Sequence, residues 1–161
     1  MCPIVGWTAS WASMPVRRRR HTTATGSPVG DPPTSLPRST DELRSSTQVI
    51  ILSDTFEQFA RPFMRQLDWP TVFCHRLLVD GDRIVDYRLR QPDQKRRSVE
   101  AFQALNYRVV AAGDSYNDTT MLNAADAGFL FRAPPNVIAE FPRFRAFDEY
   151  DELLAAIRGA L

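Results

Sequence analysis

The fold is decided by the stretch Arg108-Val109-Val110-Ala111-Ala112-Gly113-Asp114-Ser115-Tyr116-Asn117-Asp118. It starts as a short apolar run, which is typical of a strand buried on both faces of a parallel sheet. Gly113 and Asp114 end the run, and a helix follows through Met121 and Leu122. Ligands of open α/β sheets bind beyond the carboxyl ends of the strands, so this turn is a candidate site.

A second run of the same kind lies upstream. Gln48-Val49-Ile50-Ile51-Leu52 is followed directly by Ser53-Asp54-Thr55. Apolar residues then recur at steps of three and four, at Phe56, Phe59, Ala60, Phe63, Met64 and Leu67. This spacing predicts an amphipathic helix with Asp54 or Thr55 placed to cap it.

The remaining segments alternate between strand and helix patterns. Residues 71–79 and 84–90 are strand-like and are joined by Asp80-Gly81-Asp82, which is a hairpin signal. A helix over Val99 and Leu105 has Lys95, Arg96 and Arg97 near its start, and cations at that end indicate a nearby anion. A strand over 128–131 and a terminal helix over 150–157 complete the series. The alternation predicts an α/β domain with a mainly parallel sheet, flanking helices and a small β-hairpin insertion.

Composition excludes several classes of protein. The chain has 161 residues, 43% of them hydrophobic, and no apolar stretch approaches the length of a membrane helix. Lys and Arg number 20 against 19 Asp and Glu, so the net charge of +1 favours neither nucleic acid nor membranes as partners. Cys2 and Cys74 are too few for a disulfide scaffold, and a reducing cytoplasm is the default location.

Residues 1–40 differ from the rest of the chain. They are rich in Pro, Ser and Thr, contain the run Arg17-Arg18-Arg19-Arg20, and have one acidic residue, Asp31. Only Ile4-Val5-Gly6-Trp7 has a strand-like pattern. We interpret this stretch as a low-complexity, disordered N-terminal segment preceding a domain over residues 41–161.

Three origins for that segment remain open. An Arg-rich, acid-poor start resembles an organelle-targeting peptide. The arginine run also suits a phosphate or nucleic-acid patch, although no aromatic residues are interleaved with it. We favour the third origin, an out-of-frame or misplaced start, because the pattern changes abruptly to regular structure near residue 40.

Chemistry-bearing residues gather at the ends of the two buried runs. A hydroxyl such as that of Ser53, beside free helix N–H groups, makes a phosphate site. Asp114 and Asp118 straddle a turn and suit Mg²⁺, while Lys95 offers the positive charge that a transferring phosphoryl group requires. The alternatives are structural: capping by Ser53, turn or helix-dipole roles for the carboxylates, and a solvated lysine. His75 beside Cys74 is interpreted as structural.

The order of these elements resembles the haloacid dehalogenase (HAD) superfamily. More narrowly, it resembles phosphoserine phosphatases of the bifunctional phosphoserine phosphatase/homoserine phosphotransferase type. The likeness is carried by residues 49–56, 64–67, 95–99, 111–122, 133–138 and 140–142. It covers residues 41–161, and its Gly113-Asp114-Ser115-Tyr116-Asn117-Asp118 motif is highly specific.

The resemblance implies a role for each matching residue. Ser53, with Asp54 and Thr55 beside it, would bind the phosphoryl oxygens, and Lys95 would neutralise their charge as the catalytic lysine. Asp114 would bind Mg²⁺, and Asp118 would hold a metal-bound water or orient the site. Asn117 would contact the substrate or the surroundings of the metal. The implied reaction is Mg²⁺-dependent hydrolysis of O-phospho-L-serine to serine and phosphate in serine biosynthesis, in the cytoplasm.

One part of the family pattern is missing from the sequence. HAD enzymes begin with a strand ending in Asp-x-Asp, whose first Asp attacks phosphorus. No such motif precedes Ser53, and Thr8-Ala9-Ser10 follows the strand-like run. We therefore expect the nucleophile strand and the cap to be absent, leaving an empty slot between residues 49–52 and 108–112. Little or no phosphatase activity is expected from the isolated chain.

Two other functions stay open at this point. The first is phosphoryl transfer to homoserine with the same residues. The second is a non-catalytic remnant that binds phosphate or a partner chain through exposed sheet edges, which would also favour homo-oligomers.

Overall fold

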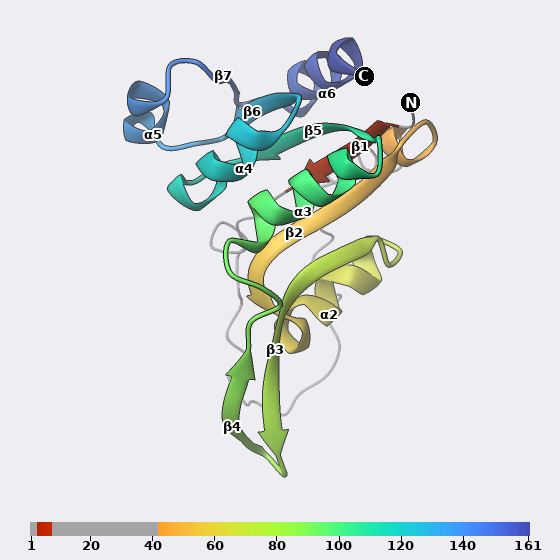
Figure 1. Ribbon diagram of the computed structural model, residues 1–161, viewed down its shortest axis with the longest axis vertical. Coiled ribbons are helices and arrows are strands. Elements are labelled where there is room, and N and C mark those ends of the chain that lie inside the picture. The colour runs from red at the N-terminus through yellow and green to blue at the C-terminus, as the bar shows by residue number, and fades with distance from the viewer. Residues whose placement is uncertain (1–2, 8–41) are drawn as a thin grey trace, which may run out of the picture.

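The computed structural model describes residues 3–7 and 42–161, which form one seven-stranded sheet with helices on both faces (Figure 1). The strands are β1 Pro3–Trp7, β2 Gln48–Phe56, β3 Thr71–Asp80, β4 Arg83–Arg88, β5 Arg108–Gly113, β6 Ala127–Phe131 and β7 Arg145–Phe147. Their order in the sheet is β4-β3-β2-β1-β5-β6-β7. The β3–β4 pair is antiparallel and every other pair is parallel. The predicted α/β class and hairpin insertion are confirmed.

The helices are α2 Glu57–Gln66, α3 Gln94–Ala104, α4 Thr119–Ala124, α5 Pro135–Glu140 and α6 Tyr150–Ala160, and a 3-10 turn spans Tyr116–Asp118. Helix α5 and strand β7 were not predicted. Both are short, and a segment of six or three residues is too brief to show a period in the sequence.

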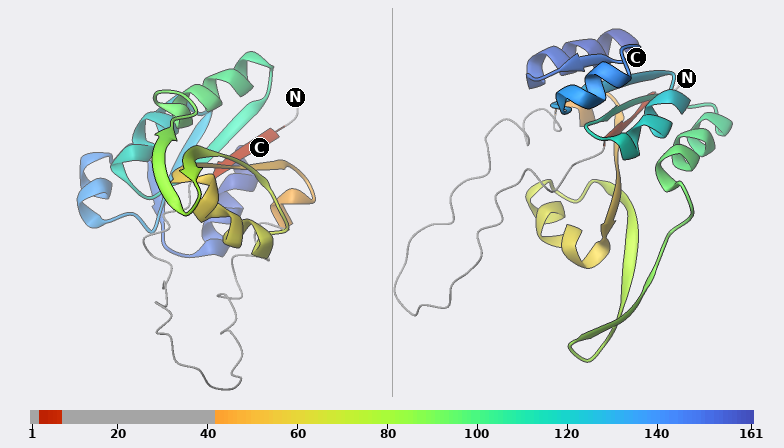
Figure 2. Two further views of the ribbon diagram at one scale, coloured as in Figure 1. Left: turned by 90° about the horizontal axis from the view of Figure 1, so that it is seen from below. Right: turned by 90° about the vertical axis from the view of Figure 1, so that its left-hand side faces the viewer.

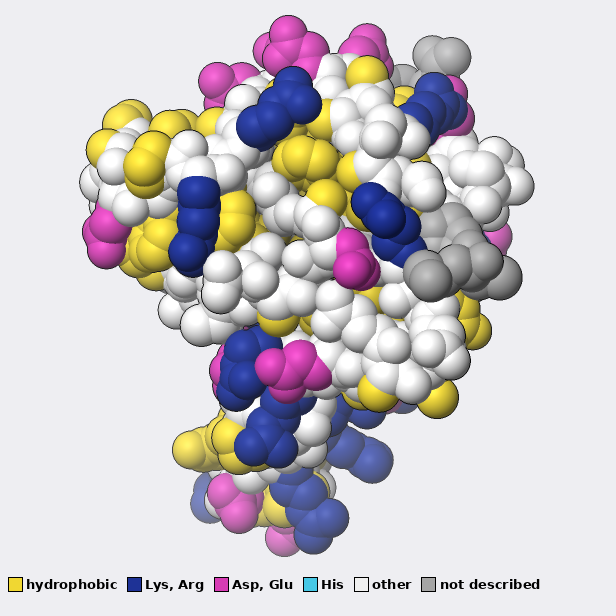
Figure 3. Space-filling model, turned by 45° about the horizontal axis from the view of Figure 1, so that its top comes forward, with side chains coloured by type: hydrophobic (Ala, Val, Ile, Leu, Met, Phe, Trp, Pro, Cys, Tyr) yellow, Lys and Arg dark blue, Asp and Glu magenta, His cyan; other side chains and the backbone are white. Residues whose placement is uncertain are grey.

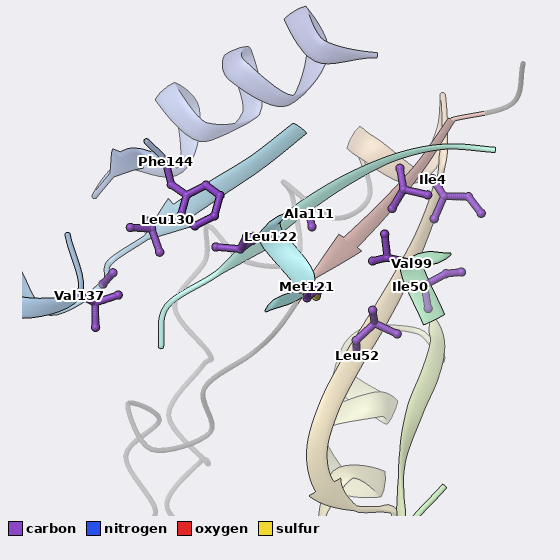
Figure 4. Packing of buried hydrophobic residues seen from close by; sticks show 12 residues of the cluster. Ile4, Ile50, Leu52, Val99, Ala111, Met121, Leu122, Leu130, Val137 and Phe144 are labelled. Atoms are coloured by element: carbon purple, nitrogen blue, oxygen red, sulfur yellow. The ribbon is translucent and has the colours of Figure 1, made fainter. Parts of the chain in front are cut away.

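Alternation along the strands divides the core into two layers. Ile4, Ile50 and Ala111 point to the face covered by α3, α4 and α5, where they pack with Val99 and Met121 (Figure 4). Val5, Val49 and Val110 point to the other face of the sheet and pack against α6. Ile51 packs against α2. Because both faces are covered, the central strands have unbroken apolar runs, at residues 49–52 of β2 and 109–112 of β5.

The central slot of the sheet is filled, contrary to the expectation from sequence. Strand β1 lies between β2 and β5 and pairs with both in parallel, with Val5 opposite Val49 on one side and Val110 on the other. Ile4 and Val5 are buried. A strand is therefore present in the nucleophile-strand position, and only the Asp-x-Asp sequence is missing. The other expectations for residues 8–41, including the missing cap, concern residues outside those described.

The end of β2 also differs from the prediction. The strand continues through Ser53, Asp54 and Thr55 to Phe56, with an irregular register against β3 between Leu52 and Phe56. Helix α2 begins after Phe56 and has no side-chain cap. Asp54 and Thr55 do not cap this helix. The Asp54 carboxylate instead faces α3, where it forms an ion pair with Lys95.

The β3–β4 hairpin projects away from the body of the molecule (Figure 2). Its turn has Gly81 at φ +57°, a conformation that glycine adopts without steric cost, and Asp80 pairs with Arg83 across it. All six residues of β4 are exposed. Within the described part of the chain, no helix is both long and apolar enough to cross a membrane.

The position of β1 predicts how a valine truncation affects stability. Val5 is fully buried, so Val5→Ala is expected to lower the free energy of unfolding by about 2 kcal/mol. The matched control is Val85→Ala on β4, where the side chain is 60% exposed and the change is expected to cost under about 0.5 kcal/mol. Urea unfolding followed by circular dichroism measures both. Equal effects would show that β1 does not occupy the centre of the sheet.

Candidate functional site

The centre of the site is the ammonium group of Lys95, which lies in the first turn of α3. Its Nζ atom is 2.9 Å from Oδ1 of Asp118 and 2.7 Å from Oδ2 of Asp54. Asp54 comes from the end of β2 and Asp118 from the turn after β5, so one lysine joins the ends of two strands that flank β1. Three predicted site residues are therefore in direct contact.

The two carboxylates differ in their surroundings. The side chain of Asp118 is 1% exposed and that of Asp54 is 45% exposed. Burial favours the neutral amine of Lys95, but the charge of Asp118 and the hydrogen bonds that the ammonium donates to both carboxylates outweigh it and raise the pKa of Lys95 above its ordinary value. Lys95 is therefore a fixed positive charge at neutral pH.

Asp118 is held by the turn that contains it. Its Oδ2 atom accepts hydrogen bonds from the backbone N–H groups of Asp114 and Ser115, each at 3.0 Å, and from the Ser115 hydroxyl at 2.9 Å. Its Oδ1 atom accepts a hydrogen bond from the Lys95 ammonium. Both oxygens of Asp118 are engaged, which suits a residue that orients the Asp114 turn and the lysine.

Ser53 and Asp54 are held by Gln94, a residue that the sequence reasoning missed. The Nε2 group of Gln94 donates to the backbone carbonyl of Ser53 and to Oδ1 of Asp54, the latter at 3.4 Å. The Ser53 hydroxyl is buried and accepts from the backbone N–H of Thr55 at 3.3 Å. Only the position of Gln94 directly before Lys95 could have indicated it.

These residues surround a cleft of about 340 Å³, a volume suited to a small molecule. Asp54, Lys95 and Asn117 line it directly, and the hydroxyl of Tyr116 on its wall donates to Glu140 at 2.7 Å. Ser53 and Asp118 are buried and contact the lining residues from the core side. The other lining residues are His75, Leu89, Gln91, Pro92, Asp93, Gln94 and Thr120.

His75 also faces this cleft. Its Nδ1 atom accepts from the backbone N–H of Arg90 at 3.2 Å, so a neutral ring carries its proton on Nε2. Nε2 lies 3.8 Å from Oδ1 of Asp54. The histidine is buried and helps to define the wall, which agrees with a structural role. The partners of His75, Asp54 and the Arg90 backbone, are distant from it in the sequence and could not be inferred from the sequence.

Two of the three cations at the start of α3, Lys95 and Arg96, have carboxylate partners within the chain. Lys95 is paired as described, and Arg96 pairs with Asp93 and with Glu100, the latter at 2.7 Å. The anions that this charge pattern predicted are therefore carboxylates of the chain itself. This pairing offsets the unfavourable position of positive charge at a helix N-terminus.

The donor set for a metal is small but suits Mg²⁺. No group of three or more His, Cys, Asp or Glu side chains suited to a metal occurs among residues 3–7 and 42–161. Mg²⁺ needs only one or two protein carboxylates, because water and substrate phosphate fill its remaining positions. Asp114 follows β5 at the edge of the site, and its backbone is fixed by Asp118. These residues fit a partial Mg²⁺ site.

Comparison with known proteins identifies the family. A model of the haloacid dehalogenase-like hydrolases matches residues 11–123. The chain belongs to this family. Two relatives of this HAD chain are phosphoserine phosphatases from Pseudomonas, and both match it over 114 residues, which is 70% of the chain. The Pseudomonas syringae pv. tomato protein is 63% identical, with 48% of its length covered, and the Pseudomonas aeruginosa protein, ThrH, is 61% identical, with 56% covered.

The HAD chain thus spans about half the length of the curated relatives it matches. Its fold is similar to a solved substrate-bound phosphoserine phosphatase complex, with a TM-score of 0.63 and 21% identity over 74% of this chain and 61% of that one. The predicted superfamily and the predicted fold class are both confirmed.

Substitution of the two partners of Lys95 is expected to have unequal effects on stability. Asp118→Asn removes the buried negative charge that pairs with the Lys95 ammonium. It should therefore lower the free energy of unfolding by about 3 kcal/mol. Asp54→Asn removes a half-exposed carboxylate and should cost under about 1 kcal/mol. Urea unfolding of both variants provides the comparison. Equal costs would contradict the central role of the Lys95–Asp118 pair.

The raised pKa of Lys95 predicts a loss of stability at alkaline pH. Below the ordinary pKa of 10.5, lysine is protonated in both the folded and the unfolded chain, so the full contribution of the ion pairs is present. Above it, the unfolded chain loses the proton first and the contribution falls. The stability difference between the natural chain and Lys95→Met should therefore stay constant from neutral pH to about pH 10 and shrink above that. A stability difference that stays constant above pH 10 as well would contradict the raised pKa of Lys95.

Proposed function

We propose that the Lys95 cleft is the phosphomonoester site of a phosphoserine phosphatase, which binds O-phospho-L-serine together with Mg²⁺. The supporting observation is the buried Lys95 ammonium, held between Asp54 and Asp118 in a cleft of about 340 Å³. The relatives that share 61% and 63% of the aligned residues are named phosphoserine phosphatases. The family reaction is hydrolysis to serine and phosphate, which would place the protein in serine biosynthesis in the cytoplasm.

The charge of the site supports the requirement for a divalent cation. Asp54 and Asp118 together carry more negative charge than Lys95 neutralises, and Asp114 adds another carboxylate at the same edge. A dianionic phosphate would be repelled from such a cleft unless further positive charge enters with it. Mg²⁺ bound at Asp114, with Asp118 orienting that turn, would supply this charge and polarise the phosphoryl oxygens.

The other predicted residues are assigned according to their positions. At the end of β2, the hydroxyl groups of Ser53 and Thr55 and the backbone N–H of Asp54 would bind the phosphoryl oxygens. Asn117 on the cleft wall would contact the rest of the substrate. Lys95 would stabilise the charge of the phosphoryl group. Gln94 joins this set as a positioning residue, because it holds both Ser53 and Asp54.

The isolated chain is proposed to bind substrate without hydrolysing it. Trp7, the last residue of β1, pairs with Ile51 and Ala112, so β1 ends beside the two strands that carry the site. The residues that follow it in sequence, Thr8, Ala9 and Ser10, include no carboxylate to attack phosphorus. Binding and chemistry are therefore separable in this chain.

Calorimetric titration with O-phospho-L-serine tests binding. Affinity is expected to rise by about tenfold or more when Mg²⁺ is present, and Asp114→Asn should abolish this gain because it removes the metal carboxylate. The control Asp82→Asn alters an exposed carboxylate in the hairpin turn and should change nothing. Mg²⁺-independent binding of the same strength in all three proteins would contradict the metal site.

Phosphate release tests the chemical part of the proposal. The chain with Mg²⁺ and O-phospho-L-serine should release no phosphate above the blank, and release that Asp114→Asn abolishes would overturn this expectation. The double variant Thr8→Asp with Ser10→Asp places an Asp-x-Asp pair directly after β1 and should restore release. Including homoserine and following phosphohomoserine separates hydrolysis from phosphoryl transfer in the restored protein.

A further inference from the structure

A second and larger cleft lies between α2 and the β3–β4 hairpin. Its volume is about 660 Å³, within the usual range for small-molecule sites. Twelve residues line it: Glu57, Ala60, Arg61, Met64, Trp69, Val72, Cys74, His75, Arg76, Arg88, Leu89 and Arg90. Four of these are arginines and one is acidic. Figure 3 shows Lys and Arg side chains gathered over the projecting hairpin.

Two of the arginines face each other without a counterion. Arg76 on β3 is directly opposite Arg88 on β4 in the antiparallel pair. Like charges in this position destabilise a sheet. No ion pair to Arg76, Arg88 or Arg90 occurs within residues 3–7 and 42–161. A bound anion would remove the repulsion between the two guanidinium groups.

The acidic residue of the cleft is already neutralised. Glu57 pairs with Arg61 at 2.8 Å. The hydrogen bond from Arg61 lowers the pKa of Glu57 against the opposing effect of burial, and the charges of Arg61, Arg76 and Arg90 add to the lowering. The positive charge of the cleft comes from its lining, in which four arginines face this one paired carboxylate.

An aromatic ring lies at the edge of the same cleft. Trp69 is 56% exposed and has φ +52°, a left-handed conformation that is rare for a bulky side chain. Its backbone N–H donates to the Met64 carbonyl at 2.8 Å, which holds the residue in place. Strained residues of this kind cluster at ligand sites. Ala60, Met64 and Val72 supply an apolar wall.

We propose that this cleft binds a small ligand that combines two or more negative charges with a flat ring, of the chemical class of nucleoside polyphosphates. Guanidinium groups bind phosphates with paired hydrogen bonds, and an exposed indole offers a face for stacking. The inference does not depend on the phosphoserine function, because Lys95, Ser53 and Asp114 do not line this cleft. The two clefts share His75 and Leu89, so the experiment must separate them.

The test is calorimetric titration of the full chain with ATP, inorganic tripolyphosphate and adenosine, without Mg²⁺. ATP is expected to bind, tripolyphosphate to bind more weakly, and adenosine more weakly still. Arg76→Gln with Arg88→Gln should weaken ATP binding by about tenfold or more, because two charge-assisted contacts are lost. The matched control, Arg83→Gln with Arg97→Gln, removes the same charge from exposed positions outside both clefts and should leave binding unchanged.

Two further variants make the assignment specific. Trp69→Leu should abolish the preference for ATP over tripolyphosphate, and Ser53→Ala should leave ATP binding unchanged because it alters the other site. Equal ATP affinity in both arginine double variants, or loss of binding in Ser53→Ala, would overturn the proposal. So would the absence of ATP binding to the natural chain at millimolar concentration. Circular dichroism and thermal unfolding confirm that each variant is folded.

Discussion

The structure depends on one buried ion pair, between the ammonium of Lys95 and the carboxylate of Asp118. Both groups are removed from water, and removal from water is costly unless each charge is fully paired. The pairing is completed by Asp54 and by the backbone of the Asp114 turn. A single charge network therefore joins α3, the end of β2 and the turn after β5. These elements cannot move independently without leaving a charge unpaired.

Strand β1 has a comparable role for the backbone. It fills the slot between β2 and β5 and pairs with both, so the two strands that carry the site are held at a fixed spacing. The structural role of this strand does not require a carboxylate at its end, whereas the chemistry of the HAD family does. The chain retains the strand, and no Asp-x-Asp sequence follows it, which is the difference on which the proposed separation of binding from hydrolysis rests.

The two clefts differ in charge in a way that suggests different ligands. One contains a single lysine between carboxylates and would take phosphate only with a divalent cation. The other contains four arginines and one neutralised glutamate, and can hold an anion directly. His75 and Leu89 lie in the walls of both. The β3–β4 hairpin, which projects from the sheet, therefore forms part of both sites.

From the sequence alone we predicted the α/β class, the hairpin, the placement of Ser53, Asp114 and Asp118 at strand ends, and Lys95 at a helix start, because buried strands and the polar residues that follow them leave a local pattern. The strand-like pattern of residues 4–7 did not reveal that Pro3–Trp7 completes the sheet, since its pairing with β2 and β5 joins segments far apart in the chain. The sequence reasoning also missed Gln94 and the second cleft. Those features bring together residues far apart in the chain, and only the folded structure decides which distant side chains meet.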